Sequence, residues 1–127
     1  MAIRIELTVR LQNSPGAAAR VCGFLADERV NVLALQLESS GILRLLVDNP
    51  VHGAAVLRER HYQVEERDVL YTAMPNGPGA VGRMATLLAE AGVNLEYLYG
   101  SAVEGHPMAA IVVGVPDARR ASAAAGI

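Results

Sequence analysis

The chain has 127 residues, with 11 arginine and lysine residues against 13 aspartate and glutamate residues, and a formal net charge of −2. This balance provides no basic stripe to neutralise phosphates, which argues against nucleic acid as a partner. Hydrophobic residues make up 52% of the chain and charged residues 19%, a composition that excludes disorder. The single cysteine, Cys22, excludes an intrachain disulfide and a multi-cysteine metal site. No apolar run approaches the length of a membrane span and no signal-peptide core is present, so we expect a cytoplasmic protein without a membrane partner.

One passage of the sequence occurs twice. Residues 13–35 and 76–98 share Asn, Pro, Gly, Arg and a Val-Asn pair at a constant offset of 63 positions. Repetition at a fixed period identifies the unit of folding, so we expect two units, residues 1–67 and residues 68–127. A unit of about 63 residues buries only a modest core on its own, and we therefore expect the two units to pack on each other.

The first copy predicts the element order βαββαβ. Residues 3–11 alternate between apolar and polar side chains, which indicates a strand with one buried face. Ser14 and Pro15 then predict the start of a helix, with Ser14 as N-cap and Pro15 at the first helical position. The full set of expected elements is a strand at 3–11, a helix at 15–28, strands at 32–38 and 42–48, a helix from Asn49-Pro50 to about Arg60, and a strand at 62–67.

The second copy predicts the order βαββα. Pro50 and Pro116, which open the second helix of each copy, are 66 positions apart, so the second hairpin is expected to be longer than the first. No residues of the second copy remain for a fourth strand, which leaves the strand at 69–74 without a neighbour from its own copy. Because open edges recruit partners, we expect a strand from the other copy or from a second subunit to cover it. The expected elements are a strand at 69–74, a helix at 78–91, strands at 95–102 and 108–115, and a last helix opened by Pro116-Asp117.

This pattern resembles the ACT domain family. The resemblance rests on Asn-x-Pro-Gly between the first strand and helix and on Val-Asn before the second strand, in both copies. It implies an α+β fold of two ferredoxin-like βαββαβ units in tandem, the second lacking its last strand, with antiparallel sheets and helices on one face. It also implies a regulatory role, in which small ligands, usually amino acids, bind where two modules meet.

The candidate ligand-binding residues lie in these repeated loops. A helix N-terminus presents unpaired N–H groups to an anion, and glycine lets a ligand approach the backbone. From the resemblance, the asparagines of both motifs contact the ligand. Tight turns also require Asn, Pro and Gly, so a turn-only role remains open. The candidates are Asn13, Pro15, Gly16, Asn31, Asn76, Pro78, Gly79 and Asn94.

The sequence gives little support for dinucleotide binding, metal binding or catalysis. Residues 77–82 fit the dinucleotide pattern G-x-G-x-x-G, but the following strands are joined by a short hairpin, whereas a dinucleotide fold needs a parallel crossover. His52, His61 and His106 have no metal-ligand spacing and are interpreted as surface residues. No catalytic set can be assembled, so we expect neither an enzyme nor a cofactor or metal site. Arg20 and Arg83 recur and could reach an anion at the helix start, but a role as ordinary surface residues at a repeated position is equally open.

Three functions remain open from the sequence. The first is a non-catalytic, amino-acid-binding regulatory protein. The second is a small hydrolase of the acylphosphatase type, disfavoured because no arginine precedes Arg20 in the first loop. The third is a dimerisation module without a ligand. A homodimer is expected because the 69–74 edge lacks a neighbour from its own copy, with Tyr97–Tyr99 or this edge in a contact. Tyr97, Leu98 and Tyr99 leave no polar face on their strand, which predicts that both faces are covered, either by a helix and the other module or by a subunit interface.

Overall fold

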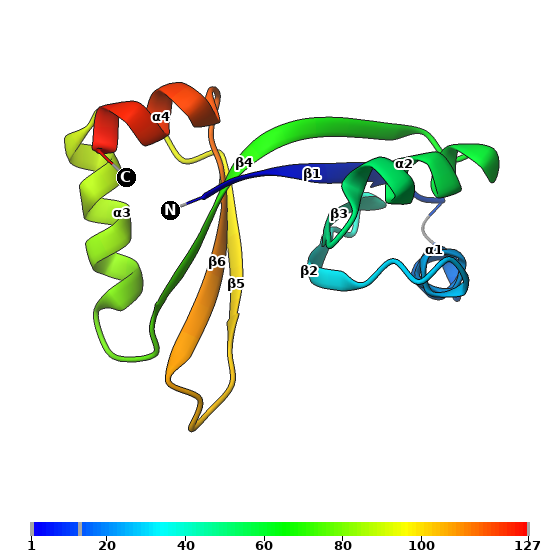
Figure 1. Ribbon diagram of the computed structural model, residues 1–127, viewed down its shortest axis with the longest axis horizontal. Coiled ribbons are helices and arrows are strands. Elements are labelled where there is room, and N and C mark those ends of the chain that lie inside the picture. The colour runs from blue at the N-terminus through cyan, green and yellow to red at the C-terminus, as the bar shows by residue number, and fades with distance from the viewer. Residues whose placement is uncertain (1, 13, 127) are drawn as a thin grey trace. The chain divides into compact units, whose positions relative to one another are not determined.

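The structure of the protein is a computed structural model that describes residues 2–12 and 14–126. The described residues form six strands and four helices, drawn in Figure 1. In chain order these are β1 (Ala2–Arg10), α1 (Ala17–Asp27), β2 (Val32–Leu37), β3 (Ile42–Val47), α2 (Pro50–Glu59), β4 (Val64–Pro75), α3 (Ala80–Glu90), β5 (Tyr97–Ala102), β6 (Met108–Gly114) and α4 (Ala118–Ala125).

The chain divides into two compact units. The first unit is Ile5–Arg67, and the second unit consists of residues 68 onward together with the N-terminal residues up to Arg4. Both boundaries fall inside strands, because Arg4 lies within β1 and Arg67 lies within β4. β1 and β4 therefore each contribute residues to both units.

The first unit has the ferredoxin-like strand order β2-β3-β1-β4. β3 pairs antiparallel with both neighbours, so that Leu45 lies opposite Leu7 of β1 and Leu35 of β2. The β2–β3 hairpin is antiparallel, and so is the β5–β6 hairpin that follows residues 77–82, so neither has the parallel crossover of a dinucleotide fold.

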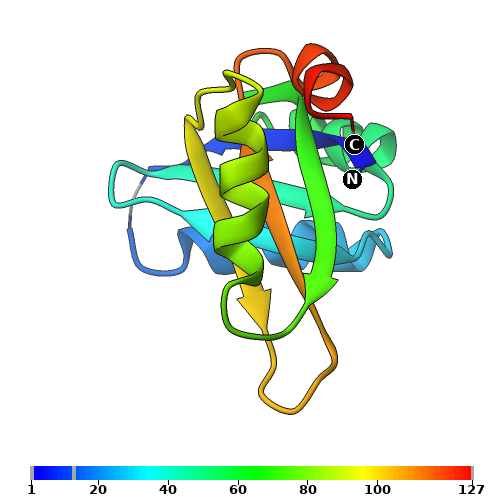
Figure 2. The same ribbon diagram turned by 90° about the vertical axis from the view of Figure 1, so that its left-hand side faces the viewer.

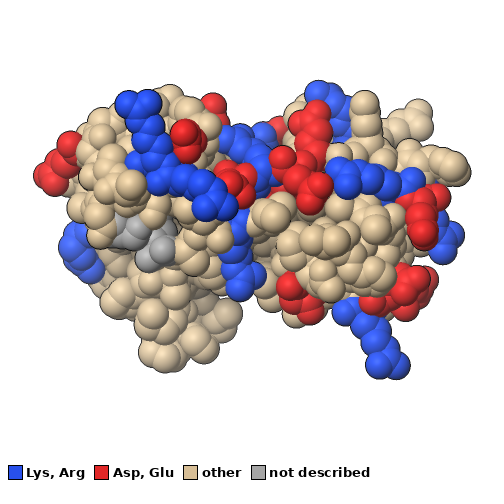
Figure 3. All heavy atoms as spheres, turned by 45° about the horizontal axis from the view of Figure 1, so that its top comes forward, with Lys and Arg blue, Asp and Glu red and all other residues tan. Residues whose placement is uncertain are grey.

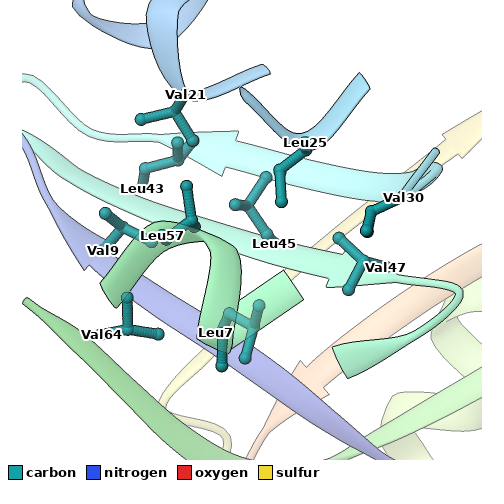
Figure 4. Close-up of a cluster of buried hydrophobic side chains, with 11 residues drawn as sticks. Leu7, Val9, Val21, Leu25, Val30, Leu43, Leu45, Val47, Leu57 and Val64 are labelled. Atoms are coloured by element: carbon teal, nitrogen blue, oxygen red, sulfur yellow. The ribbon is translucent and has the colours of Figure 1, made fainter. Parts of the chain in front are cut away.

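The core of the first unit lies between this sheet and helices α1 and α2. Alternate residues of β1 and β3 point to the same face, which both helices cover with apolar side chains. Figure 4 shows Val21 and Leu25 of α1 and Leu57 of α2 directed toward these strands. The buried members of this cluster are Leu7, Val9, Val21, Leu25, Val30, Leu43, Leu45, Val47, Ala54, Leu57 and Val64.

The second unit repeats this arrangement with one difference. Its strands follow the order β5-β6-β4-β1, so the N-terminal residues of β1 occupy the position of the missing fourth strand. Ile3 packs against the core of this unit, and the Arg4 guanidinium carbon lies 5.2 Å from the centre of the Tyr71 ring. The edge at 69–74, which the second copy leaves open, is therefore covered by the start of β1, a strand of the first copy and one of the two covers expected from the sequence.

The core of the second unit lies between β4, β6 and the helices α3 and α4. In Figure 2 helix α3 crosses in front of these strands. The buried members of this cluster are Leu70, Met74, Ala80, Met84, Leu88, Ile111, Val113, Val115, Ala118 and Ala121.

Two expectations are corrected by the structure. The strands expected at 62–67 and 69–74 are one continuous strand of 12 residues, because no turn residue separates them. Pro50 and Pro116 also do not occupy equivalent positions in the second helices of the two copies. Asn49 caps α2 and Asp117 caps α4, which sets the offset at 68 positions and not 66. The strand pairs Leu7–Leu45 and Leu70–Val113 give the same offset of 68 between β3 and β6.

The surface carries both signs of charge. On the face drawn in Figure 3, arginine side chains lie interspersed with aspartate and glutamate side chains. Several of them pair, as in the contacts of Arg44 with Glu38 at 2.9 Å and of Arg119 with Asp68 at 3.3 Å. The Arg119 side chain is exposed, and an exposed pair contributes little to stability, about 0–1 kcal/mol, whereas the Arg44 side chain is mostly buried.

Candidate functional site

The starts of helices α1 and α3 have the same geometry. Gly16 and Gly79 are their N-cap residues, both with φ of 85°, a left-handed conformation that favours glycine. Among the described residues no side chain caps either helix. The expectation that Ser14 caps α1 and Pro15 begins it was wrong, since the Ser14 hydroxyl instead donates to the Gln12 carbonyl at 3.3 Å.

The second helix of each unit, in contrast, has a side-chain cap. The Asn49 side chain accepts from the His52 N–H at 3.2 Å, and the Asp117 side chain accepts from the Arg120 N–H at 3.0 Å. Both helices are thus capped by their own chain, as helix N-termini usually are. Only the two helices that follow Asn-x-Pro-Gly lack such a cap among the described residues. Their first N–H groups are bonded by the preceding turns, from Ala17 to the Ser14 carbonyl at 3.1 Å and from Ala80 to the Gly77 carbonyl at 3.3 Å, so the next N–H groups of each first turn are those available to a ligand.

An arginine lies over each of these glycines. A Cβ atom placed on Gly16 would be 3.4 Å from Arg20 Nη1, and one placed on Gly79 would be 3.0 Å from Arg83 Nη1. Neither guanidinium has an ion pair or hydrogen bond within residues 2–12 and 14–126. A cation near the positive end of a helix is unfavourable unless an anion is present. The arrangement therefore suits a carboxylate, and it occurs in both units.

Asn76 has a structural role in the second unit. Its side-chain amide donates to the Val103 carbonyl at 3.1 Å and to the His106 carbonyl at 2.9 Å, while its backbone N–H donates to the Pro107 carbonyl at 2.9 Å. These bonds fasten the β5–β6 hairpin to the end of β4. Both side-chain N–H groups are thereby used, and the amide oxygen is the group left for a ligand. The matching Asn13 lies outside the described residues.

Asn31 and Asn94 differ in their backbone partners. In the first unit the Asn31 N–H donates to Asp48 Oδ1 at 2.9 Å, and the Asn31 carbonyl accepts from the Asp48 N–H at 3.0 Å. At the 68-position offset Pro116 replaces Asp48, and proline has neither a carboxylate nor an N–H. Asn94 consequently forms no such pair within the described part of the chain.

The candidates of the second unit do not share one hollow. Asn76 and Pro78 line an open hollow beside the β5–β6 hairpin, and Asn76 also lines a cavity of about 220 Å³ under the first turn of α3. Gly79 lies with Arg83 on the outer side of α3. Asn94 follows the other end of this helix, whose 11 residues span about 16 Å. The two repeated motifs of the second copy, at Asn76 and at Asn94, therefore lie at opposite ends of helix α3.

The three histidines lie on the surface. His52, His61 and His106 are exposed, and His106 Nδ1 is bonded within its own hairpin to the backbone of Met108. Among the described residues no group of three or more His, Cys, Asp or Glu side chains is placed to hold a metal ion. None of the described helices combines the length and the apolar character needed to cross a membrane.

Comparison with known proteins gives the family of the first unit. The family profile of the ACT domain matches residues 5–64, and no curated protein matches the sequence. Protein BT0572 from Bacteroides thetaiotaomicron has a similar structure, with 29% identity and a TM-score of 0.87 over 96% of this chain and 85% of that one.

Two aspartate kinase structures share the fold. The ligand-free regulatory subunit from Thermus thermophilus is 17% identical, with a TM-score of 0.72 over 98% of this chain and 92% of that one. Aspartokinase III of E. coli, solved in complex with lysine and aspartate, is 21% identical, with a TM-score of 0.56 over 94% of this chain and 30% of that one. The chain therefore carries an ACT domain over residues 5–64, followed by a second unit of the same ferredoxin-like fold.

Proposed function

We propose that this protein is a non-catalytic regulatory protein that binds an amino acid, and that its second unit is also an ACT module. The ligand would bind where modules meet, with its carboxylate at the start of α1 or α3. The observation that carries this proposal is the repeated pair of helix starts without a side-chain cap, each with an arginine over its N-cap glycine. Carboxylates bind well at such N-termini.

The proposed mechanism is a shift between arrangements of the modules. A ligand that contacts two modules binds one arrangement more tightly than another, and the difference in affinity stabilises that arrangement. Regulation of this kind requires no catalytic group. Aspartokinase III, which shares the fold, was solved with two amino acids bound, and this supports an amino acid as the ligand class.

A screen of the protein amino acids by thermal unfolding tests the ligand class. A ligand present at about 100 times its dissociation constant should raise the free energy of unfolding by about 2.7 kcal/mol. Arg20→Gln and Arg83→Gln are expected to weaken binding about tenfold or more, because each removes a charge-assisted hydrogen bond. Asn76→Ala should weaken binding too, but it also removes the two hairpin bonds, so the arginine variants are decisive.

The matched control for this screen is Arg119→Gln. Arg119 is exposed and pairs with Asp68, away from both helix starts. Its replacement should leave the affinity unchanged. Absence of any stabilising amino acid, or equal affinity in all three arginine variants, would contradict the proposed site. Hydrolysis of an acyl phosphate by the purified protein would contradict the non-catalytic role.

We also propose that the protein is a homodimer. β2 and β5 are the outermost strands of the strand order, and each exposes apolar side chains. Leu33, Leu35 and Leu37 of β2 are 42–50% exposed, and Leu98 of β5 is 41% exposed. Apolar edge strands usually pair with another chain. Light scattering at micromolar concentration should give twice the chain mass of 13.4 kDa, and a monomer would refute the proposal.

A further inference from the structure

The second unit contains a hollow at positions where the first unit carries larger side chains. This hollow, of about 330 Å³, lies between the end of α3 and the start of α4, and we call it the α3–α4 hollow. Its walls include Ala91, Asn94, Pro116, Arg120 and Ala124. Its volume falls at the lower end of the range for small-molecule sites, roughly 300–1,000 Å³.

The first unit shows which side chains are missing. At the offsets of 63 positions for α1 and 68 positions for α2, Ala91 corresponds to Glu28 and Ala124 to Val56. Val56 is buried in the first unit, with 6% of its surface exposed. The second unit thus lacks one carboxylate and one isopropyl group. Loss of the buried isopropyl group leaves a space that the backbone does not close, whereas the Glu28 side chain is 56% exposed, so its loss removes a charge and not packing.

The polar groups around the α3–α4 hollow have lost their counterparts in the same way. In the first unit His52 Nε2 lies 3.7 Å from the Glu28 carboxylate. Arg120 stands at the position of His52, but Ala91 offers it no carboxylate, and its guanidinium is unpaired within the described residues. An arginine is the side chain best suited to bind a free carboxylate.

The Asn94 backbone completes this set. Because Pro116 replaces Asp48, the Asn94 N–H and carbonyl lack the two bonds that Asn31 makes in the first unit. The carbonyl can accept from an ammonium group, and the carboxylate of Asp117 lies in the same wall. A carboxylate and a branched apolar group would occupy the positions of Glu28 and Val56, and an ammonium group would lie at the Asn94 carbonyl.

We propose that the α3–α4 hollow binds a small α-amino acid with a branched aliphatic side chain, for which valine is the size match. The carboxylate binds Arg120 and the Asn94 N–H. The ammonium binds the Asn94 carbonyl and Asp117, and the side chain packs on Ala91 and Ala124. This inference rests on the proposed function for the class of ligand only, because the hollow is separate from the helix starts at Gly16 and Gly79.

Titration of the ¹⁵N-labelled full chain tests the inference. The probes are L-valine, isovalerate, which lacks the ammonium, and isobutylamine, which lacks the carboxylate. L-Valine should shift the amide signals of residues 91–94 and 117–121. Each single-function analogue should bind at least about tenfold more weakly, because each loses one charge-assisted contact.

Three binding variants and one control sharpen the test. Arg120→Gln should weaken valine binding about tenfold or more, whereas the neighbouring Arg119→Gln should leave it unchanged. Ala124→Val restores the first-unit side chain and should abolish binding by filling the hollow. If that variant folds poorly, Pro116→Asp provides a second test, since it restores the partner of Asn94 and should also weaken binding.

The outcomes separate this inference from the proposed function. Valine-induced shifts confined to residues 14–20 and 77–83 would overturn the inference and leave the proposed function supported. If another amino acid binds those loops while valine shifts no amide signal at all, the inference would likewise be overturned and the proposed function supported. Shifts at 91–94 and 117–121 that persist unchanged in both Arg120→Gln and Ala124→Val would also overturn it.

Discussion

Deletion of residues 2–4 is expected to lower the stability of the second unit by about 3 kcal/mol, through one partly buried isoleucine and the backbone bonds of a strand. These residues occupy the fourth-strand position beside β4. Ile3 packs against the core of this unit, and its loss would expose apolar surface of Leu70 and its neighbours. The freed edge of β4 would also promote association between chains, because unpaired strand edges act as templates.

Hydrogen exchange measured residue by residue checks this expectation. Amides of 70–74 and 109–113 should exchange faster in the deletion variant. Amides of 21–25 and 43–47 should keep their protection, because the first-unit residues of β1, Ile5–Arg10, remain present. Equal loss of protection in both units, or none in either, would contradict the division of β1 between them.

The matched control is Arg4→Gln, which keeps the strand and removes only the guanidinium near the Tyr71 ring. An exposed cation–π contact is worth about 0.5–1 kcal/mol, so this variant should be destabilised by less than the deletion. A loss as large as that of the deletion would attribute the effect to Arg4 and not to the strand.

The repeated fold could be predicted from the sequence because its signals are local. Alternation of apolar residues in 3–11 indicates a strand within a few residues, and Pro50 and Pro116 mark helix starts by their missing N–H. These signals gave the element order of both units correctly. The second role of β1 has no such signal. It depends on pairing between residues about 65 positions apart, which alternation within one strand does not specify.

The errors of detail have a common cause. Ser14 and Pro15 have the residue types of a helix start, but Gly16 adopts the left-handed conformation and delays the helix to Ala17. Pro50 and Pro116 likewise stand at different positions relative to their helices, since Pro50 follows its cap and Pro116 precedes it. Residue types restrict the backbone without fixing it, and tertiary packing selects among the turns that remain.

The candidate site was predictable in part. Recurrence identified Asn76 and Arg83, yet it could not show that the Asn76 amide fastens the β5–β6 hairpin, because Val103 and His106 have no aligned counterparts in the shorter first hairpin. The α3–α4 hollow was missed altogether. Its signal is the loss of Glu28 and Val56 in the second copy. The first loss is visible at the offset of 63 positions, but the second requires the offset of 68 positions.

Gly100→Ala is expected to destabilise the protein by about 2–3 kcal/mol, in the range of overpacked cores. A Cβ atom on Gly100 would lie 2.3 Å from Ile111 Cδ1 and 2.5 Å from the Ala110 carbonyl oxygen. Ile111 is the cross-strand partner of Gly100 and is buried in the core of the second unit. The Ile111 side chain can rotate, but the Ala110 carbonyl belongs to the paired backbone of β6, so the strands themselves must move apart.

Denaturant unfolding of Gly100→Ala, Gly82→Ala and the double variant Gly100→Ala/Ile111→Val tests this account. Gly82 lies inside α3, and a Cβ atom added there would have open space within 4 Å, so alanine should stabilise the helix by about 0.5–1 kcal/mol. The two single variants should therefore differ in sign. Replacing Ile111 by valine removes Cδ1 and should offset part of the loss caused by Gly100→Ala, while the clash with the Ala110 carbonyl persists. A neutral Gly100→Ala would show that β5 and β6 can separate at little cost, and full recovery in the double variant would place the whole effect on Ile111.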